Sequence, residues 1–384
     1  MIKRKAEKAL LDLAGQFKAV AIIGPRQSGK TTLSRFVFPD KPYASLENPD
    51  TRRYAFEDPR GFLAQFPNGA VLDEVQRQPE LFSYLQQILD ESRLPGKFIL
   101  TGSNNFLLQA NISQSLAGRI AYLVLLPFSI GELSLPGDQD LYDLMFNGFY
   151  PPVFDQPVQP AAWYANYLRT YVERDVRQLK NIADLNTFER FLKLCAGRTG
   201  QLLNMSALAI ETGVDNKTIA SWISVLENSF ILYRLQPHHR NFNKRVVKMA
   251  KLYFYDTGLA CSLLGIQNAS QLQYHPLSGS LFENFIVGEL TKSRCNRALG
   301  NNLYFWRDNV GHEIDVIIDK GTRLYPLEIK SGQTVTPEYF RNLVFWQSIT
   351  GDTPATVVYA GTNRQQRSNG VEVIPWRELD SIDP

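Results

Sequence analysis

Residues Gly24 to Thr32 read GPRQSGKTT and directly follow the apolar run Ala19–Ile23, which is the pattern of a phosphate-binding loop. A strand that ends in a glycine-framed loop and opens a helix places consecutive backbone N–H groups around a polyphosphate. In such a loop Lys30 reaches the β- and γ-phosphate oxygens, and the Thr31 hydroxyl binds Mg²⁺. The alternative is a Gly-Ser turn that matches by chance, and the helix-like segment Leu33–Phe38 argues against it. The predicted nucleotide-binding residues are Gly24, Pro25, Arg26, Gln27, Ser28, Gly29, Lys30, Thr31 and Thr32.

A second acidic site is needed for hydrolysis, and the segment Gly69–Glu74 (GAVLDE) supplies two candidates. A short apolar strand delivers both carboxylates at its C-terminal end, where ligands bind in open α/β sheets. We expect Asp73 to hold Mg²⁺ through water and Glu74 to orient and deprotonate the attacking water. The alternative for two adjacent acids is a solvated strand end, and the phosphate-binding loop favours the catalytic interpretation.

A further group of acids, with one lysine, lies in the last third of the chain. Residues Glu313–Ile318 alternate like a strand, and Arg323–Lys330 returns after a turn. Folded as a hairpin, these strands bring Asp315 opposite Glu328. Because side chains alternate along a strand, Glu328 and Lys330 share one face.

Two carboxylates and an amine in this arrangement can bind a divalent metal, activate water and stabilise the charge on a cleaved phosphodiester. Glu283, on the predicted helix around Phe282–Phe285, could add another acid. Acids with a lysine on a hairpin are common, so the spacing alone is a weak signal.

The middle of the chain reads as helical. Four prolines within Pro151–Pro160 indicate a linker, and helices are predicted over Trp163–Leu179 and Leu185–Ala196. A helix, turn, helix and strand pattern over Ser206–Leu235 then resembles a winged helix. Two functions compete for it: DNA recognition, or packing within an ATPase. The residues that would contact a DNA groove are Asn216, Lys217, Thr218 and Ser221.

The segment Asn243–Lys251 carries four cations that could contact phosphates. Runs of charge are usually solvated faces, so both interpretations stay open. The cations are Lys244, Arg245, Lys248 and Lys251.

Composition indicates a soluble globular protein with room for two or three domains, since the chain has 384 residues and is 44% hydrophobic and 21% charged. The net charge of +3 permits a nucleic-acid partner without arguing for one. The longest apolar stretch, Ile120–Phe128, is far shorter than the roughly 20 residues that cross a bilayer. The N-terminus reads as an amphipathic helix and no signal peptide. Three cysteines without metal-binding spacing predict reduced thiols in the cytoplasm.

Ordered motifs along almost the whole chain resemble one family. It comprises bacterial and archaeal AAA+-type ATP-binding proteins whose C-terminal region is a domain of unknown function with a nuclease-like fold. The resemblance implies ATP binding and hydrolysis. The matching stretches are GPRQSGKTTL at the phosphate-binding loop, Ser45–Leu63, Val71–Phe82, Leu100–Asn105, Ser115–Arg119 and Tyr171–Val176.

The resemblance adds further candidates to the ATPase site. In AAA+ ATPases a polar residue after the strand Lys97–Leu100 hydrogen-bonds the γ-phosphate and the attacking water, and Ser103 and Asn104 are the candidates here. A simple Gly/Asn turn is the alternative. Arg119 could be a charge-stabilising finger or sensor, acting in its own chain or in a neighbour's site. A guanine-reading NKxD motif is absent from the sequence, which favours ATP over GTP.

The C-terminal hairpin is similar to the core of PD-(D/E)XK nucleases, with Asp315, Glu328 and Lys330 on the motif positions and Glu283 as an added acid. The resemblance implies a second divalent metal at this site. Ile314 stands where many of these nucleases carry proline. Many such domains keep the fold for binding only, so cleavage stays open.

The prediction is therefore an α/β chain with an AAA+ P-loop NTPase domain at 1–150, a helical and winged-helix region at 151–250 and a restriction-endonuclease-like domain at 251–384. ATP and Mg²⁺ are the expected cofactors, and Lys30, Glu74, Asn104 and Arg119 the expected catalytic residues. One hypothesis is an ATPase that drives a conformational change on DNA. The other is an ATP-switched binding module with little hydrolysis and no cleavage. DNA, a protein partner and a second copy of the chain are compatible partners.

Overall fold

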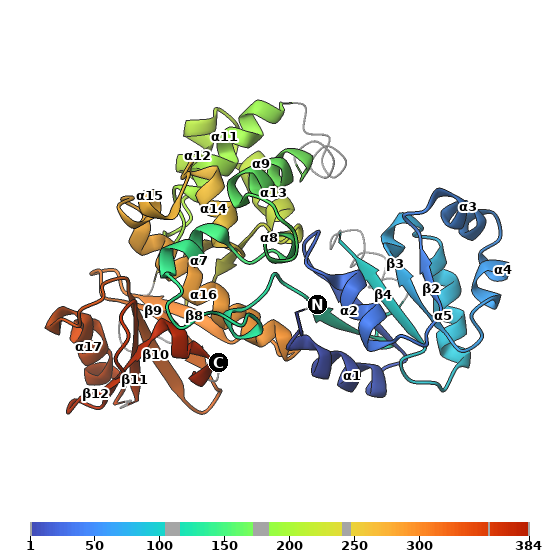
Figure 1. Ribbon diagram of the computed structural model, residues 1–384. Coiled ribbons are helices and arrows are strands. Elements are labelled where there is room, and N and C mark those ends of the chain that lie inside the picture. The colour runs from blue at the N-terminus through green and yellow to red at the C-terminus, as the bar shows by residue number, and fades with distance from the viewer. Residues whose placement is uncertain (1, 104–115, 172–183, 240–246, 352–353, 383–384) are drawn as a thin grey trace. The chain divides into compact units, whose positions relative to one another are not determined.

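The computed structural model describes residues 2–103, 116–171, 184–239, 247–351 and 354–382 (Figure 1). These residues form two compact units. Unit 1 comprises Met1–Phe128, Asn228–Phe230 and Arg294–Gly300, and unit 2 comprises Ser129–Glu227, Ile231–Ser293 and Asn301–Pro384. The boundary after Phe128 differs from the predicted boundary at 150. The reason is that α7 (Leu141–Asn147) packs on α14 (Thr257–Leu263) and α15 (Ala269–Gln273), far along the chain.

Unit 1 is built on a five-stranded, all-parallel sheet with the strand order β2-β3-β4-β1-β5. A parallel sheet with helices on both faces buries its strands on both sides, and β1, β3 and β4 are accordingly buried along their length and apolar except for Asp73 and Thr101 near their ends. Because the strands are parallel, the residues that follow them meet at one edge. The strands are β1 (Ala19–Ile23), β2 (Tyr43–Ser45), β3 (Ala70–Asp73), β4 (Phe98–Gly102) and β5 (Ile120–Val124).

The helices of unit 1 follow from local signals. α1 (Ala6–Gln16) buries Ala6, Leu10 and Ala14 on one stripe, in a core with Val20 and other strand residues, as the amphipathic pattern predicts. Side-chain caps from Asn48 and Asp58 start the third and fourth helices. The remaining elements are α2 (Lys30–Val37), α3 (Pro49–Glu57), α4 (Pro59–Ala64), η1 (Val75–Arg77) and α5 (Leu81–Glu91).

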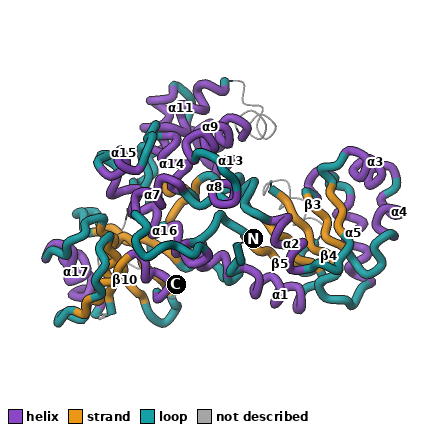
Figure 2. Tube along the Cα trace, in the orientation of Figure 1, coloured by secondary structure: helices purple, strands orange, loops and turns teal. Residues whose placement is uncertain are grey.

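The first part of unit 2 is helical, as Figure 2 shows. A short helix, α8 (Pro151–Asp155), occupies part of the predicted proline-rich linker, because proline is tolerated in the first turn of a helix. The predicted helix over 185–196 is confirmed. The helix predicted over Trp163–Leu179 is observed from Pro160 to Tyr171, and the rest of the predicted range lies outside the described residues. The elements are η2 (Ile130–Glu132), α7, α8, α9 (Pro160–Tyr171), α11 (Leu185–Ala196), α12 (Met205–Thr212), α13 (Asn216–Asn228), α14 and α15.

Two antiparallel strands, β6 (Leu232–Leu235) and β7 (Lys251–Phe254), lie between α13 and α14 in the chain. α12 ends at Gly213, which adopts the left-handed conformation, so the predicted order of helix, turn, helix and strand is present. Among the described residues, no helix combines the length and the apolar composition needed to cross a bilayer. Cys195 and Cys261 are buried free thiols, and Cys295 is partly exposed.

The end of unit 2 is a six-stranded mixed sheet with the order β12-β13-β11-β10-β9-β8. β8, β9 and β10 pair antiparallel, whereas β10, β11 and β13 pair parallel. Trp306 and Trp346 pack edge to face in the core between the sheet and α17. The elements are α16 (Ser278–Asn296), β8 (Leu303–Arg307), β9 (Glu313–Asp319), β10 (Leu324–Lys330), η4 (Pro337–Phe340), α17 (Arg341–Thr350), β11 (Ala355–Tyr359), β12 (Gln365–Gln366), β13 (Val371–Pro375) and η5 (Trp376–Ser381).

Candidate active site

The loop between β1 and α2 has the backbone geometry that its glycines predict. Gly24 has φ 153° and packs against β5, and a Cβ there would lie 2.1 Å from the carbonyl oxygen of Leu125. Gln27 and Gly29 have φ 60° and 91°. Backbone in alternating conformations of this kind forms the concave set of N–H groups that binds anions.

Lys30 opens α2 and is almost fully buried. Its ammonium donates hydrogen bonds to the carbonyl oxygens of Gly24 at 3.1 Å and Pro25 at 2.7 Å. Burial lowers the pKa of Lys30 to about 8, and the Glu74 and Asp73 carboxylates partly oppose that shift. The lysine therefore keeps its proton at neutral pH and presents a positive charge inside the loop.

Asp73 ends β3 beside the start of α2, because β3 and β1 both pair with β4. The Thr31 hydroxyl donates to Asp73 Oδ1 at 2.9 Å, and the Tyr43 hydroxyl donates to Oδ2 at 2.8 Å. Thr101, at the end of β4, also donates to Oδ1. Three hydroxyls from three elements thus hold this buried carboxylate in one orientation.

Sequence reasoning did not find Tyr43 and Thr101. Tyr43 lies on the edge strand β2, where it pairs with Val71 of β3. Ser45, two residues later on β2, pairs with Asp73. Burial and the hydrogen bond to Asp73 raise the pKa of Tyr43 to about 12. Thr101 directly follows the predicted strand Lys97–Leu100 and lies within β4, in the polar segment for which Ser103 and Asn104 were the candidates.

Glu74 follows Asp73 and has φ 55°, a left-handed conformation that a residue with a side chain rarely adopts. The chain therefore turns sharply at the edge of the sheet. The Ser103 hydroxyl donates to Glu74 Oε2 at 3.1 Å, and the Gln76 amide also donates to this oxygen. The structure thus brings Ser103 to the predicted base, while Asn104 lies outside the described residues.

The donors at this edge of the sheet suit magnesium. Mg²⁺ prefers hard oxygen ligands and retains several waters. The Thr31 hydroxyl and the Asp73 carboxylate are such ligands, they already lie within hydrogen-bond distance of each other, and they flank the loop that holds Lys30.

A hollow of about 490 Å³ lies along α2 next to these residues. Thr31 and Tyr43 line it, and so do the cationic side chains of Arg35 and Lys41. Its lining residues are Thr31, Thr32, Arg35, Phe36, Phe38, Pro39, Lys41 and Tyr43.

Arg119 does not lie near the phosphate-binding loop of its own chain. It precedes β5, and its carbonyl oxygen accepts a hydrogen bond from Ala19, the first residue of β1. The loop follows the other end of β1, about 16 Å away for five residues of strand. The Arg119 guanidinium instead forms an ion pair with Asp90 at the end of α5. The structure therefore contradicts an Arg119 contact with nucleotide in the same chain, and a contact with a neighbour's site stays a prediction.

We expect Arg119→Ala to leave the ATP affinity of dilute protein unchanged within about twofold, because surface substitutions away from a site have small effects. The affinity can be measured by calorimetry at a protein concentration low enough to disfavour assembly. A loss of about tenfold or more would contradict this placement.

Arg4 is a residue that the sequence gave no reason to select. Its guanidinium donates to the carbonyl oxygens of Ser28 and Leu126, each at 2.7 Å, and lies 4.8 Å from the centre of the Phe128 ring. This buried cation ties the phosphate-binding loop to the chain after β5. Its only signal was the basic run at the N-terminus, which also fits the exposed side of a helix.

The C-terminal hairpin has the predicted register, since β9 and β10 pair with Val316 opposite Leu327. Asp315 and Glu328 are the next residues of the two strands beyond this pair, and the Ile329 backbone N–H donates to Asp315 Oδ2 at 2.8 Å. Lys330 Nζ lies 3.3 Å from Asp315 Oδ2 and also pairs with Glu328. The predicted convergence of Asp315, Glu328 and Lys330 is thus present. Burial, with the Asp315 charge beside it, raises the pKa of Glu328 to about 8.

Glu283 reaches the same cluster from α16. Its Oε1 accepts hydrogen bonds from Lys251 at 2.9 Å and from the Tyr253 hydroxyl, both on β7. Lys251 also pairs with Glu313. Neither of the two open interpretations of the run Asn243–Lys251, phosphate contact or a solvated face, holds for Lys251, because its side chain is 3% exposed and pairs with two carboxylates. Lys244 and Arg245 of the same run lie outside the described residues.

The cluster does not fit a second divalent metal as its side chains are arranged. Within the described ranges, no three acid, histidine or cysteine side chains are grouped so that they could hold a metal ion. The physical reason is that cations already pair with these carboxylates: Lys251 with Glu283 and Glu313, and Lys330 with Asp315 and Glu328.

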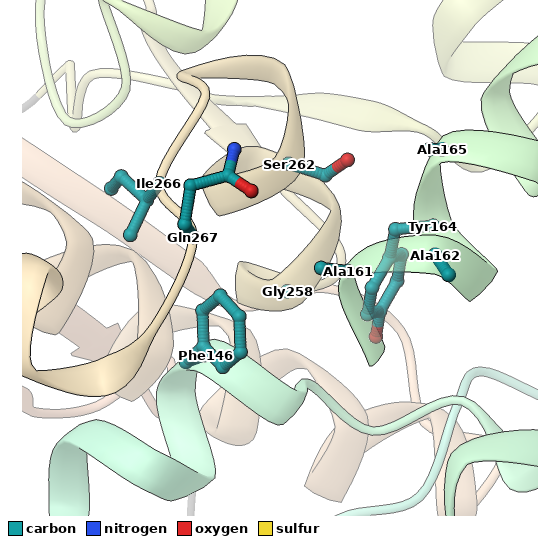
Figure 3. A pocket seen from close by; sticks show the side chains of 9 residues that line it. All are labelled: Phe146, Ala161, Ala162, Tyr164, Ala165, Gly258, Ser262, Ile266 and Gln267. Carbon is teal, nitrogen blue, oxygen red and sulfur yellow. The ribbon is translucent and has the colours of Figure 1, made fainter. Parts of the chain in front are cut away.

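A separate cavity of about 300 Å³ lies in the helical part of unit 2 (Figure 3). The Phe146 and Tyr164 rings stand on one side of it, and Ser262 and Gln267 on the other. It contains none of the predicted site residues. Its lining residues are Phe146, Ala161, Ala162, Tyr164, Ala165, Gly258, Ser262, Ile266 and Gln267.

Comparison with known proteins supports the domain type of unit 1. Residues 16–134 match the AAA domain family, and residues 138–270 and 278–379 match two domains of unknown function, DUF8612 and DUF4143. The uncharacterized proteins Mb2031c of Mycobacterium bovis and Rv2008c of Mycobacterium tuberculosis are each 32% identical to this chain over 385 residues, covering 98% of this chain and 84% of theirs. The chain belongs to their family. An uncharacterized protein of Haemophilus influenzae is 23% identical over 188 residues, covering 45% of this chain and 47% of its own length.

Among solved structures, the Walker-type ATPase PABY2304 of Pyrococcus abyssi aligns with a TM-score of 0.46 and 14% identity, covering 68% of this chain and 96% of its own. The AAA match, together with the parallel sheet, confirms the prediction of an AAA-type P-loop domain at the N-terminal end. The C-terminal residues match a family whose function is not known, so the nuclease-like assignment stays a prediction.

Proposed function

We propose that unit 1 binds ATP with Mg²⁺ and hydrolyses it. The observation that carries this proposal is the hydrogen bond of 2.9 Å between Thr31 and Asp73, which joins the helix after the phosphate-binding loop to the acidic end of β3. A glycine-rich loop alone can bind phosphate. A loop whose threonine hydroxyl lies beside an oriented carboxylate can also bind the metal ion that accompanies a nucleoside triphosphate.

Each residue has a defined task in this mechanism. The N–H groups of the loop and the Lys30 ammonium bind the β- and γ-phosphates. Thr31 and Asp73 would hold Mg²⁺, which would offset the negative charge of the phosphate oxygens. The hydrogen bonds from Tyr43 and Thr101 keep Asp73 in place for that task.

Glu74 acts on the attacking water. The oxygen of water forms a bond to the γ-phosphorus, the bond from that phosphorus to the β–γ bridging oxygen breaks, and a proton of the water passes to Glu74. ADP and phosphate leave. Ser103 and Gln76 orient the Glu74 carboxylate through hydrogen bonds to one oxygen, which leaves the other for water.

We further propose that the C-terminal sheet has a nuclease-like fold. The order α16, β8, β9, β10, α17, β11 supports this assignment, as does the meeting of Asp315, Glu328 and Lys330. Metal-dependent cleavage is not part of the proposal, because the cluster does not fit a metal. The C-terminal domain would then bind a partner without cleaving it.

DNA is the partner that we propose for unit 2. Asn216 and Lys217 are exposed in the first turn of α13, where a winged helix would contact a DNA groove. The Asp215 carboxylate at the same turn is engaged by the backbone N–H of Thr218 at 2.7 Å. A protein partner is the alternative occupant of this surface, and nucleotide state would control either interaction.

Phosphate release from ATP tests the hydrolysis proposal. We expect Mg²⁺-dependent release that Lys30→Ala removes, measured over a range of protein concentrations with and without duplex DNA. Stimulation by DNA would support the DNA-coupled ATPase, and a rate that rises steeply with protein concentration would support a homo-oligomer with Arg119 in a neighbour's site. Nucleotide binding without release, under all these conditions, would replace the ATPase with an ATP-controlled binding module.

A further inference from the structure

Lys251 is the most unusual member of the C-terminal cluster. It opens β7, whose hairpin partner is β6, and so comes from outside the helix and strands that carry the predicted acids. Its side chain is 3% exposed. A lysine is almost never buried to this extent unless its charge is paired.

The pairing of Lys251 is with carboxylates of two other elements. Nζ lies 2.9 Å from Glu283 Oε1 on α16 and forms an ion pair with Glu313 on β9. The face of the Phe305 ring lies 5.6 Å from the ammonium. A divalent metal bound to Glu283 Oε1, at about 2.0–2.6 Å, would have to occupy the position that the ammonium already takes. The ammonium and such a metal cannot occupy this place together.

Cations of the protein also lie beside the other carboxylates of the cluster. Lys330 pairs with Asp315 and Glu328, and Arg307 pairs with Glu313 at 3.1 Å. Glu328 Oε1 is buried without a hydrogen-bond partner among the described residues, so the exclusion of a metal applies to the position at Glu283, where the Lys251 ammonium lies.

We propose that Lys251 is the resident cation of this cluster and takes the place of a metal ion at Glu283, so that the domain works without a divalent metal. This inference concerns the site of the nuclease-like assignment and does not depend on ATP hydrolysis. Lys251 is a positioning residue: it fixes Glu283 and Glu313 and does not reach the surface.

The test is a calorimetric titration of the nucleotide-free full chain with Mn²⁺. We compare wild type, Glu283→Gln, Lys251→Met and the double variant, because methionine keeps the length of the lysine chain without its charge. Any Mn²⁺ bound near Asp73 contributes equally to all four proteins, so differences report the cluster. We expect Glu283→Gln to leave the Mn²⁺ affinity of the wild type unchanged within about twofold.

We expect Lys251→Met to gain Mn²⁺ affinity by about tenfold or more, and the double variant to lose that gain, since first- and outer-shell groups change metal affinity by about 10- to 100-fold. A folded Lys251→Met protein without such a gain would overturn the proposal. If Lys251→Met does not fold, the comparison of wild type with Glu283→Gln decides alone. A Mn²⁺ affinity about tenfold lower in Glu283→Gln would show that Glu283 is a metal ligand and would reject our assignment. Phosphate release is measured separately, so failure of the ATPase proposal cannot be confused with either result.

Discussion

Replacing Glu74 with glutamine will lower ATP turnover by about a hundredfold or more and leave ATP affinity nearly unchanged, because removal of a general base typically costs 10²- to 10⁴-fold in rate. Glutamine keeps the shape of the side chain, and the hydrogen bonds from Ser103 and Gln76 can be made to its amide oxygen. The left-handed backbone at residue 74 is also retained, so folding is not affected. Turnover is measured as phosphate release and affinity by calorimetry.

A matched control is Glu80→Gln, which neutralises an exposed glutamate of the same unit. Its turnover should stay within about twofold of the wild type. Unchanged turnover in Glu74→Gln would reject Glu74 as the base. A loss of ATP binding in the same variant would show instead that Glu74 contributes to the ground-state site.

The second large effect is expected for Asp73→Asn. Three hydroxyls donate to the Asp73 carboxylate, and asparagine has one acceptor oxygen in place of two. The variant therefore loses a negative charge that faces Mg²⁺ and the fixed orientation of that ligand. We expect turnover to fall by about a hundredfold, a loss typical of groups that stabilise a charged transition state.

The measurement that tests Asp73→Asn compares its ATP affinity in the presence of Mg²⁺ with its ATP affinity in the presence of EDTA. Wild type should bind ATP more tightly in Mg²⁺, and Asp73→Asn should show little difference between the two conditions. Asp90→Asn is the control, since Asp90 is a carboxylate of the same unit that pairs with Arg119 at the opposite edge of the sheet. If Asp73→Asn keeps the full magnesium effect, the metal is held elsewhere.

The sequence was sufficient to predict the central part of the ATP site. A phosphate-binding loop is a local feature, because one strand, one loop and one helix start produce it, and Lys30 and Thr31 follow from the spacing. Asp73 could be predicted for a related reason. Parallel strands end at a common edge, so an acid after a second strand must lie near the loop.

Residues that complete the site through tertiary contacts could not be predicted in the same way. Tyr43 reaches Asp73 from the edge strand, and Arg4 reaches the loop from the N-terminal segment, and neither has a characteristic spacing to the loop. The sequence left open whether Arg119 acts in its own chain or in a neighbour's, because a residue that precedes a strand lies far from the loop only if that strand runs parallel to β1. Here the parallel pairing of β1 and β5 puts it at the far edge.

In the C-terminal cluster as well, the residues set by local pattern could be predicted, and the residue that depends on tertiary packing could not. Strand periodicity and the hairpin register predicted Asp315, Glu328 and Lys330 together, and both are local properties. The burial of Lys251 could not be predicted, because a run of cations in a sequence indicates a solvated or phosphate-contacting surface. Only the packing of β7 against α16 and β9 turns one of those cations inward, where it pairs with Glu283 and Glu313.

Nucleotide binding by the loop around Lys30 is the property on which the proposed function most directly rests. Calorimetric titration of the folded full chain with ATP and Mg²⁺ tests this claim. We predict saturable binding of about one nucleotide per chain, lost in Lys30→Ala, since that variant removes the buried ammonium that faces the phosphates. A folded wild type with no measurable affinity for adenine nucleotides, or with the same affinity in Lys30→Ala, would contradict the account.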